Sequence, residues 1–396
     1  MMESTLRLGV DTGGTYTDAV LLDPDGRVVS AAKALTSHHE LTIGIREAID
    51  QLPGEQLPHI SLVSLSTTLA TNAVVEGRGT PVCLLLAGYN ARQVDKAKLE
   101  HIVRGGHCAL ISGGHDAGGS ESEPLDIERA RQVVTDQRDQ VAAFGISGLF
   151  GVRNPEHELK LRELVASLTG KPVTCGHELA SQLDAPRRAL TVAFNASLIT
   201  YIDELIRAIK LILNERAIHA PLMMVKGDGS LISADTALAR PVETILSGPA
   251  ASVMGAAQLQ PQDSAIIADM GGTTTDIAIV TGGKPVISAK ATLIGEWRPM
   301  VDAVRVFSLG LGGDSEVRFQ GGVGLAIGPR RVVPMSLLVH RYPEVLTTLE
   351  RRVDAAVSPR SNRFAVALFA ETSQKRSFSQ EETAAWERLQ RGPLDV

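Results

Sequence analysis

Short apolar runs alternate with turn signals at the start of the chain. Residues 6–10, 19–22 and 28–32 are apolar, and they are separated by Asp-Thr-Gly-Gly and by Asp-Pro-Asp-Gly at residues 23–26. Short apolar runs bounded by Gly, Pro and Asp are typical of strands joined by tight turns. The pattern therefore predicts an antiparallel meander at the beginning of the fold.

The pattern then changes to an alternation of helices and strands. Helical spacing at residues 41–52 is followed by strands at 62–65 and 82–86, with a helix beginning near Thr68 between them. Further strands are expected at 141–146, 173–175, 222–225, 265–268 and 277–280, and further helices at 155–167 and 248–257. A hairpin-like opening followed by this alternation favours a mixed-sheet α/β fold over an all-parallel doubly wound one.

Two longer segments differ from their surroundings. Asp184 and Pro186 mark the start of a long helix, in which one apolar face is formed by Leu190, Phe194, Leu198, Ile202, Leu205, Ile209 and Ile212. Residues 105–123 contain six glycines with little periodicity. We expect the first segment to be a core helix and the second to be a loop or lid.

Composition and charge narrow the classes of partner. The chain of 396 residues is 44% hydrophobic and 4% aromatic, with a net charge of −6. This argues against a nucleic-acid partner, which usually needs a basic face and, for single strands, aromatic stacking. Three separated cysteines without CxxC spacing support neither a disulfide framework nor a zinc site, and the N-terminal residues lack the apolar core of a signal peptide. We expect a cytoplasmic protein without a membrane segment.

An internal repeat carries the candidate chemistry. Residues 11–18 read DTGGTYTD and residues 269–276 read DMGGTTTD, which agree at six of eight positions. Glycines at such a turn can adopt positive φ and leave no Cβ in the way, so that backbone N–H groups can converge on an anion. Threonine hydroxyls add donors, and carboxylates are ligands for Mg²⁺ beside phosphates. The predicted phosphate-binding residues are Gly13, Gly14 and Thr15 in the first turn and Gly271, Gly272, Thr273 and Thr274 in the second.

The two aspartates at the entrances of these turns complete the predicted site. Asp11 and Asp269 would face each other across a cleft if the two halves of the chain are related by a pseudo-two-fold axis. We expect both to bind Mg²⁺ and to be needed for catalysis. Neither a GxxxxGK[ST] P-loop nor a GxGxxG dinucleotide motif occurs at these turns.

A third glycine cluster follows in the order expected for a loop on the nucleoside side of a nucleotide. Residues 310–315 read GLGGDS, and the predicted adenosine contacts are Gly312, Gly313, Asp314 and Ser315.

Four polar groups have both a functional and a structural interpretation. Thr67, Thr68, Thr71 and Asn72 could line the floor of a cleft or cap a helix. Ser247 could contact substrate or phosphate at a helix N-terminus, or only begin that helix. Lys226 and Asp228 could enter the cleft or form a surface turn. The last group consists of His107, Cys108, His115 and Asp116. These residues could bind a metal or a substrate, or they could belong to a solvated loop. Of these, Thr68, Asn72 and Ser247 are our candidate substrate contacts.

These segments together resemble the hydantoinase A / 5-oxoprolinase / acetone carboxylase subunit family. The matching stretches are LGVDTGGTYTDAVLLD (8–23), STTLATNAVVEGRG (66–79), LSGPAASVMGA (246–256), IIADMGGTTTDIAIV (266–280) and GLGGDS (310–315). The resemblance implies a two-lobed actin-like ATPase fold built from duplicated RNase H-like domains. The lobes would span residues 1–186 and 187–334, and residues 335–396 would form a helical C-terminal extension that is shorter than in the family.

The resemblance also implies an activity and partners. It implies ATP and Mg²⁺ as cofactors and the opening of a cyclic amide, of the hydantoin or 5-oxoproline type, by phosphorylation of the substrate carbonyl. The implied partners are a small cyclic amide or ketone substrate, a second subunit of the hydantoinase B kind, and another copy of the chain. A small-molecule kinase of the same fold and a non-catalytic, regulatory nucleotide-binding module are alternatives, because function lies in the site rather than in the fold.

Overall fold

The computed structural model describes residues 5–14, 16–37, 40–103, 105–259, 262–288, 292–320, 322, 324–354, 363–367 and 379–396. The chain divides into two compact units, and each is described by itself. The first unit comprises Met1–Ile267 and Ala278–Val306, and the second comprises Ala268–Ile277 and Phe307–Val396.

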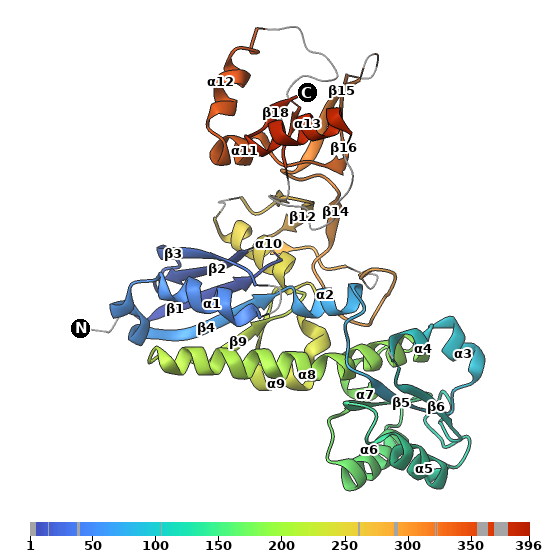
Figure 1. Ribbon diagram of the computed structural model, residues 1–396. Coiled ribbons are helices and arrows are strands. Elements are labelled where there is room, and N and C mark those ends of the chain that lie inside the picture. The colour runs from blue at the N-terminus through green and yellow to red at the C-terminus, as the bar shows by residue number, and fades with distance from the viewer. Residues whose placement is uncertain are drawn as a thin grey trace. The chain divides into compact units, whose positions relative to one another are not determined.

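A six-stranded mixed sheet forms the first layer of the first unit (Figure 1). Strands β1 (Leu6–Thr12), β2 (Tyr16–Leu22) and β3 (Val28–Leu35) are antiparallel neighbours, which confirms the predicted meander. β4 (Ile60–Thr67) and β9 (Leu222–Val225) add in parallel beyond β1, and β10 (Leu231–Ser233) closes the edge as an antiparallel strand. The order β3-β2-β1-β4-β9 is that of an RNase H-like sheet.

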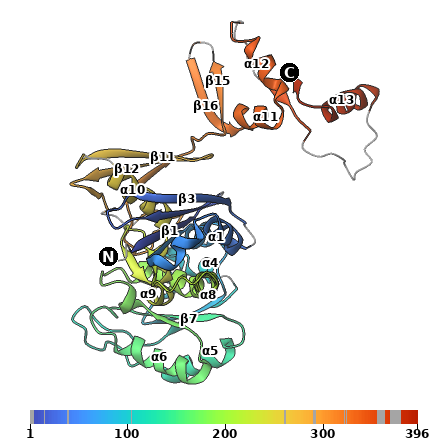
Figure 2. The same ribbon diagram turned by 90° about the vertical axis from the view of Figure 1, so that its left-hand side faces the viewer.

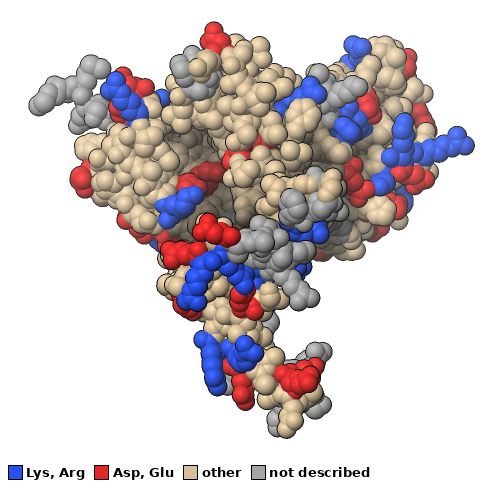
Figure 3. All heavy atoms as spheres, turned by 90° about the horizontal axis from the view of Figure 1, so that it is seen from above, with Lys and Arg blue, Asp and Glu red and all other residues tan. Residues whose placement is uncertain are grey.

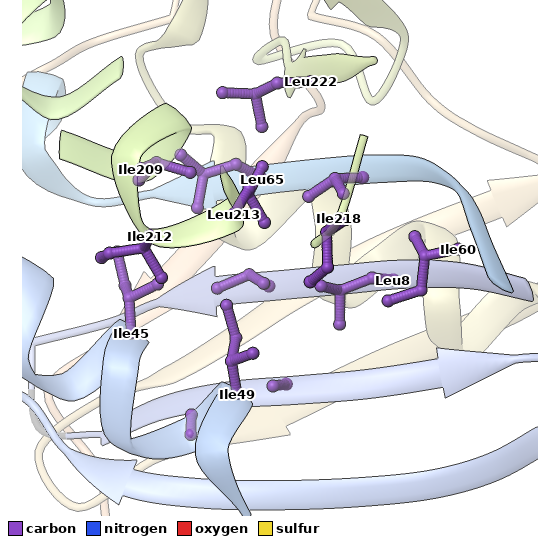
Figure 4. Packing of buried hydrophobic residues seen from close by; sticks show 14 of the residues in the cluster. Leu8, Ile45, Ile49, Ile60, Leu65, Ile209, Ile212, Leu213, Ile218 and Leu222 are labelled. Carbon is purple, nitrogen blue, oxygen red and sulfur yellow. The ribbon is translucent and has the colours of Figure 1, made fainter. Parts of the chain in front are cut away.

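Helices cover both faces of this sheet, as Figure 2 shows. Helix α1 (Leu41–Asp50) and the C-terminal half of α8 (Ala185–Glu215) lie on one face, and α10 (Ser247–Leu259) contacts β1, β4 and β9 on the other. Figure 4 shows α1 and α8 directing isoleucine and leucine side chains onto β1 and β4. The short elements of this part of the chain are η1 (Gly54–His59), α2 (Leu69–Val75), α9 (Ala234–Ala239) and η2 (Pro241–Thr244).

A second sheet, which is entirely parallel, lies between β4 and α8 in the sequence. Its strands are β5 (Val82–Ala87), β6 (His107–Ile111), β7 (Ala143–Gly148) and β8 (Val173–Cys175), in the order β6-β5-β7-β8. Helices α5 (Ile127–Gln137) and α6 (Glu156–Thr169) cover one face. The short helices here are α3 (Ala91–Lys96), α4 (Leu99–Ile102) and α7 (Gly176–Leu179).

The predicted mixed-sheet α/β fold is confirmed by the six-stranded sheet, and the second sheet adds a parallel part to it. One sequence-based expectation is corrected by this second sheet. The prediction of a loop or lid over residues 105–123 is wrong for its first part, because β6 pairs with β5 from His107 to Ile111. β6 is a short edge strand with several partly exposed positions, so its apolar pattern is weak.

Helix α8 packs against both sheets of the first unit. Its 31 residues begin after Asp184, whose side chain accepts a hydrogen bond from the Arg187 N–H, and Pro186 lies in the first turn as predicted. The N-terminal half packs with β5, and the half from Ile202 to Leu213 packs with β1 and β4. All seven predicted apolar positions are buried. The N-terminal half is buried all round and not on one face, because Thr191, Asn195 and Ser197 are buried as well.

By length and composition alone, α8 could cross a membrane. However, 72% of its most apolar window is buried inside the protein, and the buried core helix of a soluble protein meets the same criterion. The helix is therefore weak support for a membrane span.

The remaining strands and helices lead into and form the second unit. β11 (Ala265–Met270), β12 (Thr275–Thr281) and β14 (Val306–Leu309) each contain a boundary between the units, and β13 (Lys284–Pro285) pairs with the end of β12. β15 (Ser315–Gln320) and β16 (Gly324–Arg331) form an antiparallel hairpin, and β17 (Phe364–Ala365) pairs with β18 (Leu394–Asp395). Helices α11 (Met335–Arg341), α12 (Glu344–Glu350) and α13 (Gln380–Gln390) lie in the predicted helical extension.

The predicted segments 1–186, 187–334 and 335–396 differ from the two compact units. β9, from the second predicted segment, pairs with β4 from the first. The compact units are defined by contacts between residues, whereas the predicted lobes are defined by duplication of a fold. The boundaries of the predicted lobes therefore stay a prediction.

We expect burial along α8 to determine the stability of the first unit. Ile209 is 2% exposed and Leu211, on the same helix, is 57% exposed. Ile209→Ala should lower the free energy of unfolding by about 2–5 kcal/mol, because it removes buried methyl groups and leaves a cavity. Leu211→Ala should change it by no more than about 0.5 kcal/mol. Urea unfolding followed by circular dichroism measures both, and equal losses would contradict the packing described here.

Candidate functional site

The two glycine turns are closed by the same hydrogen bond. The Gly13 N–H donates to the Tyr16 carbonyl at 3.0 Å, and the Gly271 N–H donates to the Thr274 carbonyl at 2.9 Å. These residues hold equivalent places in DTGGTYTD and DMGGTTTD, so the repeat in sequence is also a repeat in backbone geometry. Thr15 lies outside the described residues.

The glycines of these turns do not use the positive φ that glycine permits. None of Gly13, Gly14, Gly271, Gly272, Gly312 and Gly313 has a positive φ. What glycine supplies at these positions is the missing side chain. Apart from the adjacent residues of the chain, no described atom lies within 4 Å of where a Cβ of Gly14 or Gly272 would be, so both turns are open toward the described part of the chain. Thr273 and Thr274 are exposed beside Gly272.

In the first unit, Asp11 is held by a serine that the sequence analysis missed. Ser66 Oγ donates to Asp11 Oδ1 at 2.5 Å, and the two residues are directly opposite each other in the parallel pairing of β1 with β4. Ser66 is buried. The register of the two strands brings Ser66 to Asp11. Ser66 directly precedes Thr67 and Thr68, which the sequence had marked as candidates, but no local pattern relates it to Asp11.

The TTLATN and SGPAA segments meet beside this aspartate. Ser247 Oγ donates to the Thr67 carbonyl at 2.9 Å and accepts from the Thr67 N–H at 3.2 Å. The Leu246 N–H donates to Thr71 Oγ1 at 2.9 Å. A Cβ on Gly248 would lie 3.9 Å from Asp11 Oδ1. Three segments far apart in the sequence therefore build one polar cluster around Asp11.

The individual candidates in this cluster have different environments. Ser247 is fully buried, and both of its hydrogen bonds join the two segments, which is a positioning role. Thr67 Oγ1 accepts a hydrogen bond from the Leu69 N–H at the start of α2, so the side chain of Thr67 caps this helix locally. The side chain of Thr68 makes no capping hydrogen bond. Asn72 is exposed, and its Nδ2 donates to Thr68 Oγ1 at 3.3 Å. Substrate contact by Thr68, Asn72 and Ser247 stays a prediction.

In the second unit, the second glycine turn and the GLGGDS loop lie against each other. The Gly313 N–H donates to the Gly271 carbonyl at 3.0 Å, and the Asp314 N–H donates to the Gly272 carbonyl at 2.8 Å. A Cβ on Gly312 would lie only 2.4 Å from the Gly272 carbonyl oxygen. The predicted phosphate and adenosine loops are thus adjacent, and this approach requires glycine at position 312.

Two side chains of the GLGGDS loop have different hydrogen-bonding states. Ser315 Oγ accepts from the Gly312 N–H at 3.0 Å. Asp314 Oδ1 is buried and has no hydrogen-bond partner in the described part of the chain. A buried acceptor without a donor is costly, so this oxygen fits a hydroxyl or amino donor of a bound nucleoside. Asp11 and Asp269 belong to different units, so their predicted opposition across a cleft, and Mg²⁺ binding by the pair, stay predictions.

The histidines and cysteines in the glycine-rich segment do not form a metal site. His107 and Cys108 lie on β6, and Asp116 accepts hydrogen bonds from the backbone of its own turn. His115 is buried with its ring 4.3 Å from that of His157, and burial lowers the pKa of His115, which favours the neutral ring. In the described ranges, the side chains with metal-ligand spacing are Glu158, Cys175 and His177.

That group is already satisfied by hydrogen bonds. The Glu158 carboxylate accepts from the Gly148 N–H at 2.7 Å and from the His177 N–H at 2.8 Å, and it pairs with His177 Nδ1 at 2.6 Å. Burial raises the pKa of the Cys175 thiol to about 12, which makes it a poor metal ligand. The group is therefore part of the packing of the second sheet.

Charged side chains of both signs are interspersed on the face in Figure 3. A basic stripe of the kind that follows a nucleic-acid backbone is not seen on that face.

We expect Gly312→Ala to separate the two loops of the second unit. The added methyl group cannot fit 2.4 Å from the Gly272 oxygen, whereas an added Cβ on Gly310 would have no neighbour within 4 Å among the described residues, its chain neighbours aside. Amide hydrogen exchange at Gly313 and Asp314 should become at least roughly tenfold faster in Gly312→Ala, because their hydrogen bonds open. Gly310→Ala is the matched control and should leave these rates unchanged. Unaltered exchange in Gly312→Ala would mean that the loops are not in contact.

Comparison with known proteins covers most of the chain. Residues 7–169 match the hydantoinase/oxoprolinase N-terminal region, and residues 188–337 match hydantoinase/oxoprolinase. The caprolactamase subunit alpha of Pseudomonas jessenii is 32% identical over an alignment of 359 positions, which covers 83% of this chain and 51% of that subunit. The acetophenone carboxylase gamma subunit of Aromatoleum aromaticum is 28% identical, over 82% of this chain and 49% of that subunit.

Solved structures agree with these matches. The crystal structure of the ATP-dependent caprolactamase from Pseudomonas jessenii aligns with a TM-score of 0.69 at 30% identity, over 82% of this chain and 51% of that chain. The nucleotide-free acetone carboxylase aligns with a TM-score of 0.66 at 21% identity, over 83% of this chain and 51% of that one, which shows a shared fold. The chain spans about half the length of the curated relatives that it matches. The α/β fold and the resemblance expected from the motifs are confirmed: the chain belongs to the hydantoinase/oxoprolinase family.

Proposed function

We propose that this chain is the nucleotide-binding part of an ATP-dependent enzyme that opens a cyclic amide. The observation that carries the proposal is the repeated glycine turn, closed by equivalent hydrogen bonds at Gly13 and Gly271. The relative of known structure that supports it is described as an ATP-dependent caprolactamase. Since this chain spans about half of that protein, activity, substrate and partners are proposals.

The residues that would hold the nucleotide are those of the three loops. Gly14 and Thr15 in one turn and Gly272, Thr273 and Thr274 in the other would donate to phosphate oxygens, whereas Gly13 and Gly271, whose N–H groups close the turns, would hold the backbone in place around the phosphates. Asp314 would accept from the nucleoside, because its buried Oδ1 lacks a donor within the described residues. Gly312, Gly313 and Ser315 would keep this loop against Gly271 and Gly272.

Asp11 and Asp269 would hold Mg²⁺ through their carboxylates. The Ser66 hydroxyl at 2.5 Å fixes the orientation of Asp11, and the SGPAA segment packs beside it. Pre-oriented carboxylates lower the entropic cost of holding a metal–phosphate complex. Positioning such a complex and neutralising its charge are the main contributions of a protein to phosphoryl transfer.

Mg-ATP, when bound, would supply a phosphoryl group to the amide oxygen, which makes the carbonyl carbon of an otherwise poor electrophile more reactive. Water would then add to that carbon, the C–N bond would break with a proton passing to the ring nitrogen, and a second water would hydrolyse the remaining acyl phosphate to a carboxylate and inorganic phosphate. The protein has to position the groups and to neutralise charge, and no nucleophilic side chain is required. This agrees with the lack of a Ser-His or Cys-His signature in the sequence.

The same geometry serves two other activities. A small-molecule kinase would leave a stable phosphorylated product, and a regulatory module would bind ATP without turnover. We also propose a second subunit of the hydantoinase B kind as a partner, since the relatives are named as an alpha and a gamma subunit. The TTLATN and SGPAA segments, which meet at Asp11, favour the amide-opening activity over the alternatives.

The test is phosphate release from Mg-ATP with ε-caprolactam, 5-oxoproline, hydantoin and acetophenone as candidate substrates. Asp11→Asn and Asp269→Asn should each lower substrate-stimulated release by roughly 10²–10³-fold, because each removes a preorganised charge. Asp25→Asn, in an exposed turn, is the matched control and should retain full release.

The outcomes separate the candidate functions. Phosphate release with ring opening supports the amide-opening enzyme, and a stable phosphorylated product would instead identify a kinase. ATP binding without turnover on any compound would identify the regulatory module. Full activity in both aspartate variants would refute the role of the two turns.

A further inference from the structure

The part of the glycine-rich segment that follows β6, residues 112–123, forms a strap over the carboxyl end of the second sheet. The His115 N–H donates to the carbonyl of Leu149, which follows β7, at 3.2 Å. A Cβ on Gly88, which follows β5, would lie only 2.6 Å from the Gly113 carbonyl oxygen. In the order β6-β5-β7-β8 the strand order reverses between β5 and β7. The strap therefore rests on the strand ends where doubly wound sheets bind their ligands.

The strap is held to helix α6 by the imidazole of His157. This histidine lies in the first turn of α6 and is 1% exposed. Its Nδ1 accepts a hydrogen bond from the Gly114 N–H at 2.9 Å, and its Nε2 lies 2.8 Å from Glu121 Oε1. A ring nitrogen that accepts from an N–H carries no proton, so the proton of the neutral ring is on Nε2 and is donated to Glu121. One neutral tautomer of His157 thus binds the strap at two places.

His115 belongs to the strap, and its ring nitrogens have no such partners. The residue is 2% exposed, and neither Nδ1 nor Nε2 has a hydrogen-bond partner in the described part of the chain. The centroid of its ring lies 4.3 Å from that of His157, with 43° between the ring planes. A protonated ring would bring two N–H donors and a charge into this position, and burying a charge without partners is costly.

The charged groups around His115 do not offset that cost. They are Glu156 and Lys160, which pair with each other on α6 at 2.6 Å, and Glu121 and Asp116 on the strap. Glu156 and Glu121 favour a charged His115, whereas Lys160 and a charged His157 oppose it. Burial is the largest influence, and it lowers the pKa of His115 below its ordinary value of 6.5. The closed strap therefore keeps this ring neutral.

This burial makes the closed strap sensitive to acid. Above pH 6.5, the ordinary pKa of a histidine, the ring is neutral in the open and in the closed strap, so closure keeps its full stability. As the pH falls below that value, the open strap takes up a proton on His115 and the closed strap does not, which favours opening. A His157 ring with protons on both nitrogens could no longer accept from Gly114, so protonation there would act in the same direction.

We propose that residues 112–123 are an acid-released cover on the carboxyl end of the parallel sheet, with His115 as the proton sensor and His157 as the latch. Release would uncover the residues that follow β5 and β7. The cover lies apart from the three nucleotide loops in the sequence, and the proposal does not depend on the proposed function.

Amide hydrogen exchange of the strap, measured by mass spectrometry without nucleotide, tests the proposal. After correction for the intrinsic effect of pH on exchange, protection of the strap should fall roughly five- to tenfold from about pH 7.5 to about pH 5.5, which is the effect of one histidine that stays neutral in the closed state. Peptides from β5 should remain more protected than the strap throughout. Equal protection of the two would mean that the sheet unfolds as a whole and that no separate cover opens.

A substitution of the sensor separates His115 from other titrating groups. His115→Phe keeps an aromatic ring in the buried position and removes both unpartnered nitrogens, so protection of its strap should not change with pH. His59→Phe is the matched control, because His59 is exposed, and its strap should lose protection in acid as the unaltered protein does. His157→Phe removes the latch and should lower protection at every pH.

Two results would overturn the proposal. One is strap protection that does not change with pH in the unaltered protein, a measurement that requires no variant to fold. The other is the same loss of protection in His115→Phe as in the unaltered protein, which would place the titrating group elsewhere.

Discussion

The first unit depends on the burial of one helix. α8 is shared by two sheets that are otherwise built from different parts of the chain, and its N-terminal half is buried on all sides. Burying an apolar side chain stabilises the folded state by about 1.5–3 kcal/mol compared with leaving it exposed. The buried apolar side chains between Ala189 and Leu213 therefore contribute a large share of the stability of this unit. The Asp184 cap and Pro186 determine where the helix starts, and this start in turn places Arg187 beside residues 298 and 299.

The candidate site depends on close approach of backbone to backbone. In the second unit, the carbonyls of Gly271 and Gly272 accept from the backbone of the GLGGDS loop, which needs position 312 to lack a side chain. In the first unit, the parallel pairing of β1 with β4 places a hydroxyl against Asp11. Both arrangements use backbone contacts to fix polar groups before any ligand binds, which lowers the cost of organising a binding site.

In the polar segments of the family motif, some side chains are buried and join segments, and others are exposed. The residue types alone do not show which is which. Ser247 is a bridge between two backbones and is closed to solvent, whereas Thr273, Thr274 and Asn72 are open. Groups that hold the segments together are buried and hydrogen-bonded, because an unpaired buried hydroxyl would be costly. Groups that can reach a ligand remain exposed. In the proposed site, the exposed groups would carry the chemistry and the buried ones would hold the segments together.

The sequence by itself determined the elements whose signals are local. The meander, the long helix with its cap, and the duplicated turn with its aspartates follow from turn residues, periodicity and repetition within short windows, and the motifs identified the family. The tertiary structure decided what depends on contacts between distant residues. The parallel sheet that includes β6, the bond from Ser66 to Asp11, the contact of position 312 with position 272, and the contact of the His115 and His157 rings all bring together residues that no local pattern relates. The turn glycines do not use the positive φ that glycine permits, and only packing shows that Gly312 excludes a side chain because the Gly272 carbonyl oxygen lies so close.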